Sequence, residues 1–516
     1  MRRAVLKDGR VFDEALSVRE FCTRPDAYTE LIFDIAPKVN DGIIYAKIDS
    51  KSSVTMERGY FETMHGPAAD IRIAVGICTY HREEYVHRTL SLLQKAFLEN
   101  QQSELYGKLK VYISDNGGTL DCQGESVSCV RNKNAGGSGG FARCMIEALN
   151  EWDAYQFTHF LFMDDDILLE PEAVYRTYML LAAGVRYPDA AVGGALLRSD
   201  VKEIQHACGE NWEIGRIISP KAGLCLTKKR DLLRNEQELP VEYNGWWYCC
   251  VPFGREERDC LPLPLFIHGD DIEYGMRRKK KLLYLNGISV WHDAFENRRA
   301  SCMEYYDIRN TLLLVSAFCE KKVSKRQVER LVLRRLIGQF LKYRYRDMEM
   351  TVRAVKDFCR GAEFLKDQEP ESLHQRLLAM GYQPKDMTKE LDQLQPEWRN
   401  PRIDRERMYV EKHFHLYLIL LLNGWLLPGR GKKAALPMGV WAGKLFWIKR
   451  VLYYDPETGK GFECSRKYKE LRHLIKNGYM IWRLLEKYWD QAVRSYQVNA
   501  RELTGAEFWM KYLELS

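Results

Sequence analysis

Residues 160–168 read FLFMDDDIL, in which four large apolar residues lead directly into Asp164, Asp165 and Asp166. A short apolar run of this kind is typical of a strand buried within a sheet. Three adjacent carboxylates repel one another unless water screens them or a cation lies between them. The stretch therefore predicts a buried strand that ends either in a solvated acidic turn or at a cation site.

Three further stretches have the same form, a short apolar run followed by turn residues and a helical pattern: 71–80 (IRIAVGICTY), 109–118 (LKVYISDNGG) and 190–197 (AAVGGALL). Strands that alternate with helices indicate βαβ units and a parallel sheet in an α/β domain. Ligands of such sheets bind where the carboxyl ends of the strands meet. We therefore expect the residues that follow these strands to form the site.

The 516 residues are too many for one ordinary core, and the pattern changes twice along the chain. Residues 1–69 contain short alternating runs and predict a small β-rich module, whereas residues 70–310 carry the α/β pattern. Residues 311–516 have helical spacing and predict a helical, basic region. The basic charge fits either a solvated helix surface or contact with anionic lipid headgroups.

The chain has no apolar segment behind its basic amino terminus and no regular cysteine spacing, so we expect a cytoplasmic protein without a disulfide framework. The apolar run 416–427 is too short to span a bilayer and is expected to be a buried helix. Residues 440–454 mix aromatic side chains with Lys444, Lys449 and Arg450, which favours an interfacial helix and a peripheral membrane contact. No nucleic-acid-binding signature is present, so we expect no nucleic acid partner.

Asp164 and Asp166 have a DxD spacing, which places both side chains on one face if the strand stays extended, with Asp165 pointing away. Carboxylate oxygens suit Mg²⁺ or Mn²⁺, ions that also bind diphosphate oxygens. Upstream, residues 131–140 (RNKNAGGSGG) form a glycine-rich loop that could bring backbone N–H groups close to a phosphate. The loop matches neither the dinucleotide fingerprint nor a GK[ST] phosphate loop, so those two readings lose support.

Four motifs occur in a fixed order: FMDDDI, YNGWW at 243–247, PLPLFI followed by a DD pair at 262–271, and VWH at 290–292. In this order they resemble the galactofuranosyltransferases of glycosyltransferase family 2, among them the enzyme type that builds mycobacterial galactan. The resemblance covers about residues 72–310. It implies a GT-A-type, Rossmann-like nucleotide-sugar domain, a UDP-sugar donor, a glycan or glycolipid acceptor, and a location at the inner face of a bacterial cell membrane.

The resemblance also implies a role for each matching residue. The expected metal ligands for Mn²⁺ or Mg²⁺ are Asp164, Asp166 and His292. The expected base is Asp271, which would take a proton from the acceptor hydroxyl in an inverting displacement. The expected donor-binding residues are Thr79, Arg82, Asp115, Asn134, Gly137, Asp164 and Asp165. The expected acceptor-binding residues are Trp246, Trp247, Asp270, His268 and Glu210.

Several of these residues also have a purely structural interpretation. His292 could be a core histidine, Asp270 and Asp271 could begin a helix, and Trp246 and Trp247 could lie in the core instead of forming a platform for sugar rings. The sequence departs from the family at His268 and Gly269, where a basic and an aromatic residue are usual, so the acceptor could differ. The amino-terminal module is also shorter than the family's.

Two other functions remain open at this point. One is a related transferase that uses another UDP- or dTDP-hexose, such as rhamnose. The other is a nucleotide-sugar or glycan-binding protein without turnover, although binding alone does not require a positioned base such as Asp271. A homo-oligomer is compatible with the sequence, which does not determine the oligomeric state.

Overall fold

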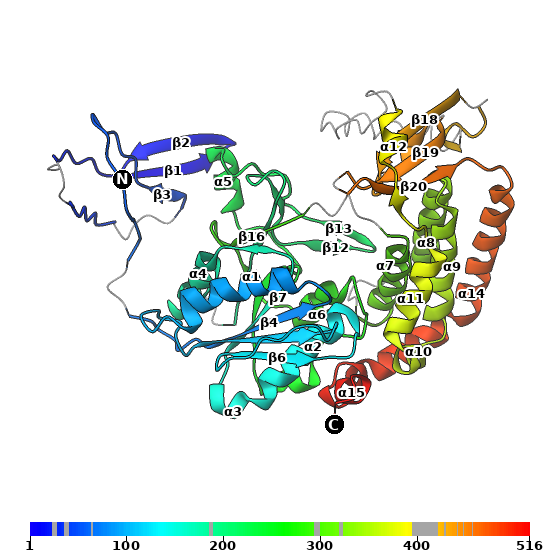
Figure 1. Ribbon diagram of the computed structural model, residues 1–516, viewed down its shortest axis with the longest axis horizontal. Coiled ribbons are helices and arrows are strands. Elements are labelled where there is room, and N and C mark those ends of the chain that lie inside the picture. Colours follow the sequence, from blue (N-terminus) through cyan, green and yellow to red (C-terminus); the bar gives the residue numbers. More distant parts are fainter. Residues whose placement is uncertain are drawn as a thin grey trace.

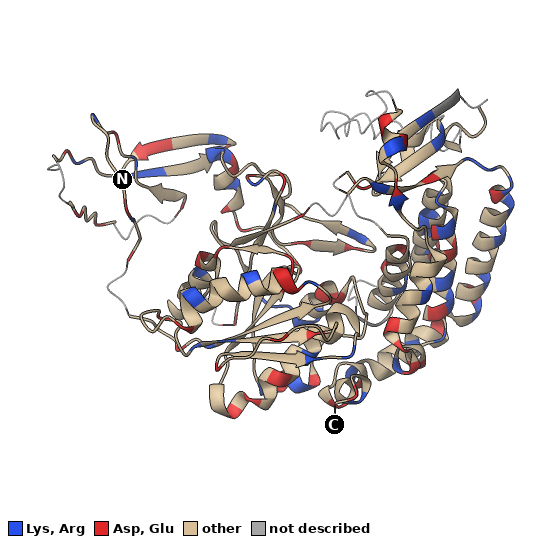
Figure 2. Ribbon diagram, in the orientation of Figure 1, with Lys and Arg blue, Asp and Glu red and all other residues tan. Residues whose placement is uncertain are grey.

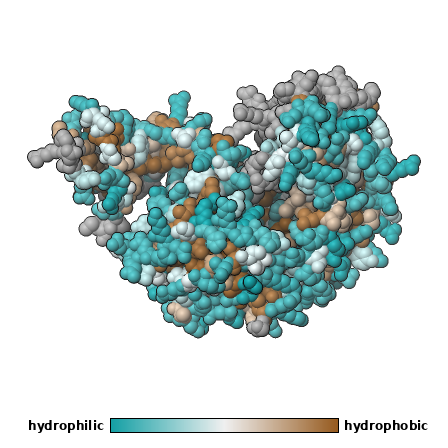
Figure 3. All heavy atoms as spheres, in the orientation of Figure 1, coloured by the Kyte–Doolittle hydropathy of each residue, from teal (hydrophilic) through white to brown (hydrophobic). Residues whose placement is uncertain are grey.

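The computed structural model describes residues 1–22, 28–35, 41–62, 66–184, 189–293, 300–318, 323–394, 422–427, 430–440, 442–446, 448–456 and 458–515. Three parts follow one another along the chain: a small amino-terminal sheet, a large α/β part, and a carboxyl-terminal part in which several helices stand side by side (Figure 1). The outline is indented between the first and last parts (Figure 3).

A seven-stranded sheet forms the centre of the α/β part. Its strands, in spatial order, are β15 (Leu282–Leu283), β9 (Ala191–Gly193), β14 (Tyr248–Pro252), β7 (His159–Asp164), β4 (Ile73–Thr79), β5 (Leu109–Asp115) and β6 (Val127–Arg131). Strands β7, β4, β5 and β6 are parallel, whereas β14 runs antiparallel to both β7 and β9. The sheet is therefore mixed, and the four parallel strands end at one edge.

Helices cover both faces of this sheet, which explains why its strands are apolar on both sides. On one face, β4 and β7 pack with α1 (Glu83–Leu93), which continues as the π-helix η1 (Gln94–Leu98), and with α4 (Pro171–Ala182). On the other face lie α2 (Gly136–Asn150) and α15 (Ala506–Tyr512), and the Trp509 indole donates to the Pro262 carbonyl at 2.8 Å. The last helix of the chain thus completes the core of the α/β part.

A second, four-stranded sheet stands beside the first, in the order β11 (Gln205–Ala207), β10 (Ala195–Arg198), β16 (Ser289–His292) and β8 (Leu168–Leu169). Strand β8 follows the acidic triplet after one residue, and it pairs with β16 through Trp291 and Leu168. Because β8 follows β7 closely in the chain, this pairing places the end of β16 near the end of β7. Shorter elements nearby are α3 (Trp152–Tyr155), β12 (Asn211–Glu213), β13 (Arg216–Ile218), α5 (Lys229–Asn235), the 3-10 helix η2 (Arg255–Asp259) and α6 (Asp270–Arg278).

Within residues 1–69, strands β1 (Arg2–Lys7), β2 (Arg10–Ala15) and β3 (Ile43–Tyr45) form an antiparallel sheet in the order β2-β1-β3. This small sheet lies against α5 (Figure 1). The Lys229 ammonium on α5 bonds to the Tyr45 hydroxyl at 2.8 Å and also contacts the Asp13 carboxylate. The contact ties the amino-terminal sheet to the α/β part.

The carboxyl-terminal part is built from helices that carry both acidic and basic residues along their length (Figure 2). Its elements are α7 (Cys302–Leu313) with η4 (Leu314–Phe318), α8 (Lys325–Leu341), α9 (Tyr345–Phe358), α10 (Ala362–Asp367), α11 (Pro370–Met380), α12 (Thr388–Asp392) and α14 (Glu470–Leu503). Their shared core also contains Leu263, Leu265 and Phe266 of the α/β part. The two parts therefore share one core at the loop that precedes α6.

A four-stranded sheet lies beyond the helices and was not predicted from the sequence. Its order is β17 (Lys385–Asp386), β20 (Lys460–Ser465), β19 (Ile448–Tyr454) and β18 (Arg430–Pro437), with the short helices η6 (Leu422–Gly424) and η7 (Ala442–Leu445) beside it. The prediction of an interfacial helix over 440–454 is wrong, because β19 buries Val451, Leu452 and Tyr453 in the core of this part. The first half of the apolar run 416–427, residues 416–421, lies outside the described residues, and the second half begins with η6.

Among the described residues, no helix is both long enough and apolar enough to cross a membrane.

Candidate active site

The acidic triplet lies at the carboxyl edge of the parallel strands. Strand β7 ends at Asp164, and Asp165 and Asp166 already belong to a turn. The alternation of side chains predicted for an extended strand does not apply here, because the strand ends before Asp165. Instead, one nitrogen of the Arg82 guanidinium binds both, at 2.9 Å from the Asp165 carboxylate and in close contact with Asp166. Arg82 lies between β4 and α1, so its ion pairs with Asp165 and Asp166 link the loop after β4 to the loop after β7.

His292, the last residue of β16, lies against the same triplet. Its Nε2 is 3.1 Å from the Asp166 carboxylate, and its Nδ1 donates to the backbone carbonyl of Asp293 at 2.6 Å. Burial opposes the charged form, but Asp166 outweighs it and raises the pKa of His292. The Nδ1 bond orients the ring so that Nε2 faces the carboxylates, as expected for a histidine that binds a metal ion through Nε2.

Asp164 carries the largest electrostatic cost of the triplet. Burial and the neighbouring Asp166 and Asp165 raise the pKa of its carboxyl group to about 8. Two carboxylates and one imidazole fit the donor chemistry of Mn²⁺ or Mg²⁺, and a divalent cation would offset the repulsion at Asp164. In the part of the chain that the structure describes, no three His, Cys, Asp or Glu side chains already surround one metal position.

The expected donor residues lie along the same edge, at the ends of β4 and β5. Thr79 ends β4, is buried, and lies near Asp165, whose pKa burial raises against the opposing charge of Arg82. Asp115 ends β5 and accepts hydrogen bonds from the backbone N–H groups of the loop that follows it, at residues 117, 118 and 120 (3.0, 2.9 and 2.8 Å). Asp115 thus shapes its own loop, a role that was not predicted.

The glycine-rich loop begins α2 at the same edge. The side chain of Asn134 accepts from the N–H of Gly136 at 3.2 Å, and Gly137 follows in the first turn. At Gly136, where φ is +71°, a Cβ would lie 2.0 Å from the carbonyl oxygen of Phe266. At Gly137 it would lie 3.4 Å from the carboxylate of Asp270. Glycine therefore allows the start of α2 to approach the loop that carries the expected base.

Asp270 and Asp271 begin α6, as the helix-start interpretation predicted. The loop before them takes left-handed backbone conformations at Phe266, His268 and Gly269, with φ of 74°, 64° and 90°. Burial and mutual repulsion raise the pKa of Asp270 to about 7, and burial and the Glu210 charge do the same for Asp271. A carboxylate with a pKa near 7 is well matched to general-base catalysis at neutral pH.

Helix α7 holds this loop in place through two adjacent residues that were not predicted. The Arg309 guanidinium donates to the Leu265 carbonyl at 2.6 Å, and the Asn310 amide donates to the carbonyls of Ile267 (2.9 Å) and His268 (2.6 Å). Both side chains are buried. The sequence held a signal for this role: Arg309 and Asn310 are adjacent polar residues in the mainly apolar segment 308–315. A polar side chain buried in such a segment must find a hydrogen-bond partner.

His268 points away from the loop toward α7. Its Nδ1 lies 2.8 Å from the carboxylate of Asp307, which also accepts from Arg335 of α8 at 2.9 Å. The ring is half-exposed, and its proximity partly opposes the rise in the pKa of both Asp270 and Asp271. His268 therefore lies near the expected base, with its Nδ1 held by Asp307 of α7.

Glu210 joins the site from the other side of Asp271. It pairs with Tyr243 in an isolated antiparallel bridge, and the Tyr243 hydroxyl lies beside its carboxylate. Burial raises the pKa of Glu210 to about 7, although Tyr243 opposes the shift. Tyr243 is the first residue of the YNGWW motif, so the motif contributes to the site through a residue that was not predicted.

Trp246 and Trp247 do not form the predicted platform for sugar rings. The Trp246 ring stacks on Phe162 at 4.4 Å between centroids and meets the edge of Phe141 at 5.0 Å. Trp247 donates from its indole to the carbonyl of Gly194 at 2.8 Å. Both indoles are more than 90% buried in the cores of the central sheet, so the core interpretation is correct and the platform prediction is wrong.

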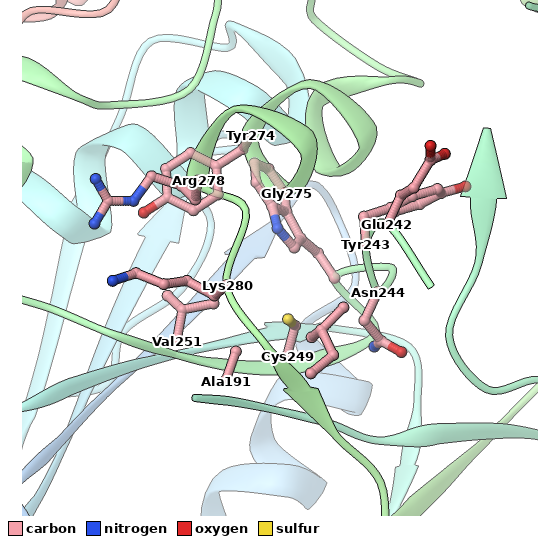
Figure 4. Close-up of a pocket in the computed structure, with 12 residues that line it drawn as sticks. Ala191, Glu242, Tyr243, Asn244, Cys249, Val251, Tyr274, Gly275, Arg278 and Lys280 are labelled. Carbon is pink, nitrogen blue, oxygen red and sulfur yellow. The ribbon is translucent and has the colours of Figure 1, made fainter. Parts of the chain in front are cut away.

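A separate pocket lies beside the second half of α6. It has a volume of about 20 Å³ and is bordered by Tyr274 and Arg278 of that helix, with Tyr243, Asn244 and Val251 across from them (Figure 4). Trp246 is the one predicted site residue that borders it. The expected base lies at the opposite end of α6, so this pocket is distinct from the predicted site.

No protein-family model matches the chain. It is 28% identical over 368 residues to galactofuranosyltransferase GlfT2 of Mycolicibacterium smegmatis, and 28% identical over 373 residues to the protein of the same name from Mycobacterium tuberculosis. The resemblance to the galactofuranosyltransferases is confirmed. The matches cover 66% and 65% of the chain but 55% of each GlfT2 protein, so the chain spans little more than half the length of these relatives.

Two solved structures are also similar to parts of the chain. One is the mannosyltransferase PcManGT from Pyrobaculum calidifontis in complex with GDP-Man and Mn²⁺, with 11% identity, a TM-score of 0.31, and coverage of 72% of this chain and 92% of that one. The other is glucosyl-3-phosphoglycerate synthase from Mycobacterium tuberculosis, with 14% identity, a TM-score of 0.29, and coverage of 48% and 79%. At these scores neither likeness adds to the fold described above.

Proposed function

We propose that this protein is a metal-dependent, inverting glycosyltransferase with a GT-A-type domain. It would transfer galactofuranose from UDP-galactofuranose to a hydroxyl of a lipid-linked glycan at the cytoplasmic face of the cell membrane. One observation carries the proposal: Asp271, a partly buried carboxylate with a pKa raised to about 7, lies within electrostatic reach of the acidic triplet that contacts His292. The similarity to GlfT2 supports the choice of sugar.

The acceptor side of the reaction requires a base. In the proposed step the acceptor oxygen attacks the anomeric carbon, the bond from that carbon to the diphosphate breaks, and the acceptor proton passes to Asp271. The first turn of α6 holds this carboxylate, which accepts from the Ile272 N–H at 2.8 Å. Asp270, Glu210 and His268 would bind acceptor hydroxyls around it. A single displacement of this kind inverts the anomeric configuration.

The donor side requires the leaving diphosphate to be held and its charge offset. Asp164, Asp166 and His292 are the proposed ligands of Mn²⁺ or Mg²⁺, which would offset the charge that develops on the diphosphate. Arg82 already lies at this edge and could bind a phosphate through its other N–H groups. Thr79, Asp115, Asn134, Gly137 and Asp165 would line the nucleotide around it.

Release of nucleoside diphosphate tests the proposal directly. The assay combines the protein with Mn²⁺ or Mg²⁺, a galactose-terminated glycolipid and a panel of UDP-galactofuranose, UDP-galactopyranose and dTDP-rhamnose. We expect turnover of UDP-galactofuranose, and loss of that turnover in Asp164→Ala, in Asp271→Asn and after chelation. Asp153→Asn, an exposed aspartate on α3, is the matched control and should keep full activity.

Two results would contradict the proposal. Turnover of dTDP-rhamnose alone would retain the chemistry but change the donor. Tight donor binding with no turnover on any acceptor would instead favour a binding protein, because a positioned base would then have no use.

A further inference from the structure

The first half of α14 exposes a continuous apolar face. Leu471, Ile475, Tyr479 and Trp482 are spaced four, four and three residues apart, so they lie on one side of the helix. Their side chains are 39%, 66%, 57% and 45% exposed. The Tyr479 and Trp482 rings are 5.8 Å apart, so the face is contiguous and differs from scattered single apolar residues, which are common on any protein surface.

The opposite side of the same helix already has its partners. Ile481, Leu485 and Trp489 are buried in the core that α14 shares with α8 and α9. Packing within the chain therefore accounts for one side of α14 and leaves the face of Leu471, Ile475, Tyr479 and Trp482 unexplained. This set is called the α14 face below.

Basic residues border the α14 face along its length. Arg472, Lys476 and Arg483 each follow a residue of the face by one position, and a step of one residue turns about 100° around a helix. All three are exposed. Across residues 467–487 the chain has six Lys or Arg and two Glu, and Figure 2 shows blue segments along α14. The face thus combines aromatic and aliphatic side chains with an adjacent row of positive charge.

We propose that the α14 face binds the surface of an anionic phospholipid membrane, with the helix lying in the plane of the interface. Tyr and Trp favour the headgroup region because their rings are apolar and their polar tips stay hydrated. Anionic headgroups attract juxtaposed Lys and Arg. A second copy of this chain is a poorer occupant, because a symmetric pairing would bring the two positive rows together.

This surface replaces residues 440–454 as the membrane contact. There, Lys444, Lys449 and Arg450 lie on or beside β19, whose apolar side chains are already buried in the protein. Membrane binding by the α14 face does not depend on the proposed transferase activity. Flotation tests the membrane contact and diphosphate release tests the activity, so either proposal can be contradicted without the other.

Flotation of the full chain with vesicles tests the proposal. The vesicles consist of phosphatidylcholine, with or without phosphatidylglycerol. We expect binding to the vesicles that contain phosphatidylglycerol and loss of that binding at high salt. Replacing the basic row, as R472Q/K476Q/R483Q, should weaken binding roughly 100-fold. Replacing two apolar residues, as I475S/W482S, should weaken it about tenfold, since apolar area would no longer be buried in the interface.

Two controls separate the α14 face from general surface properties. V498S changes the exposed end of the same helix, and K444Q/K449Q/R450Q removes the charges near β19; both should bind like the wild type. Melting curves confirm that each variant is folded. The proposal fails if the wild type does not bind, if both α14 variants bind normally, or if K444Q/K449Q/R450Q removes binding. It also fails if sedimentation reveals a dimer that I475S/W482S dissociates, since a second copy would then occupy the face.

Discussion

The two ends of α6 treat buried carboxylates in opposite ways. In its last turn, Arg277 pairs with the buried Glu273 one turn earlier and also donates to the carbonyl of Leu261 at 2.8 Å. The buried Glu257 pairs with Arg278 in the same way. At its first turn, the buried Asp270 and the partly buried Asp271 are adjacent and lie near Glu210, and their pKa values rise to about 7.

The difference shows which carboxylates of this region lack a guanidinium partner to offset the free-energy cost of burying their charge. A buried carboxylate with a guanidinium partner stays ionised and stabilises the position of its helix. A buried carboxylate without one binds a proton near neutral pH and can exchange that proton with a substrate. One end of α6 is therefore built to fix the helix, and the other to perform chemistry. The predictions below test this contrast.

The largest effect is expected at the catalytic end. Asp271→Asn keeps the shape of the side chain but removes the proposed base, so turnover should fall by roughly 10³-fold. The melting temperature should stay the same or rise, because a buried charge is removed. Steady-state kinetics and thermal unfolding measure the two quantities. A large loss of stability together with the loss of activity would assign Asp271 to structure instead.

The opposite pattern is expected at the paired end. Arg277→Ala leaves Glu273 buried without its cation, so the free energy of unfolding should fall by about 3–5 kcal/mol. Denaturant unfolding measures this change, and Arg277→Lys is the control that retains a positive charge. Activity per folded molecule should persist at low temperature. Unfolding indistinguishable from the wild type would mean that the ion pair does not fix this end of the helix.

A third change tests how tightly the catalytic end is positioned. Gly136→Ala places a Cβ against the Phe266 carbonyl and requires an alanine at φ of +71°, so the loop before Asp270 must move. A small displacement of the base should lower kcat about 100-fold. Gly338→Ala is the control, because nothing lies within 4 Å of its added Cβ. Normal kcat in Gly136→Ala would show that the loop tolerates the shift.

The pH dependence of stability and of activity should run in opposite directions. The pKa of Asp271 rises from 3.8 to about 7 on folding, so its protonated form stabilises the folded state fully below pH 4 and this contribution disappears as the pH rises through 7. Activity requires the ionised form and should increase over the same range. The melting-temperature difference between wild type and Asp271→Asn, followed from pH 5 to pH 8, isolates the group. A constant difference would contradict the raised pKa.

The smallest effect is expected for an ion pair on the surface. Lys325 of α8 contacts the Glu486 carboxylate of α14 at 2.5 Å, but both side chains are partly exposed and water screens their attraction. Lys325→Gln should leave the melting temperature and the activity unchanged within error. A clear loss of stability would show that the contrast between buried and exposed pairs is weaker than the two ends of α6 suggest.

Local patterns predicted the central strands and the start of α6 well. The apolar runs that end at Thr79, Asp115 and Asp164 are strands β4, β5 and β7, because a sheet covered on both faces requires such runs. The helix start at Asp270 follows from two acidic residues behind a glycine. The predicted fold failed at 440–454, because a mixture of aromatic and basic residues suits a strand beside a core as well as an interfacial helix.

What the sequence determined by itself is therefore the order of the strands along the chain and the residue types at their ends. Tertiary structure alone decided which of those residues meet. The contact of His292 with Asp166 depends on strand pairing across the two sheets, and the burial of Trp246 depends on its stacking against Phe162. Glu210, whose charge acts on Asp271, comes from a separate bridge, and α7 holds the loop before Asp270. Such contacts join residues distant along the chain, and no local pattern encodes which distant surface will cover a side chain.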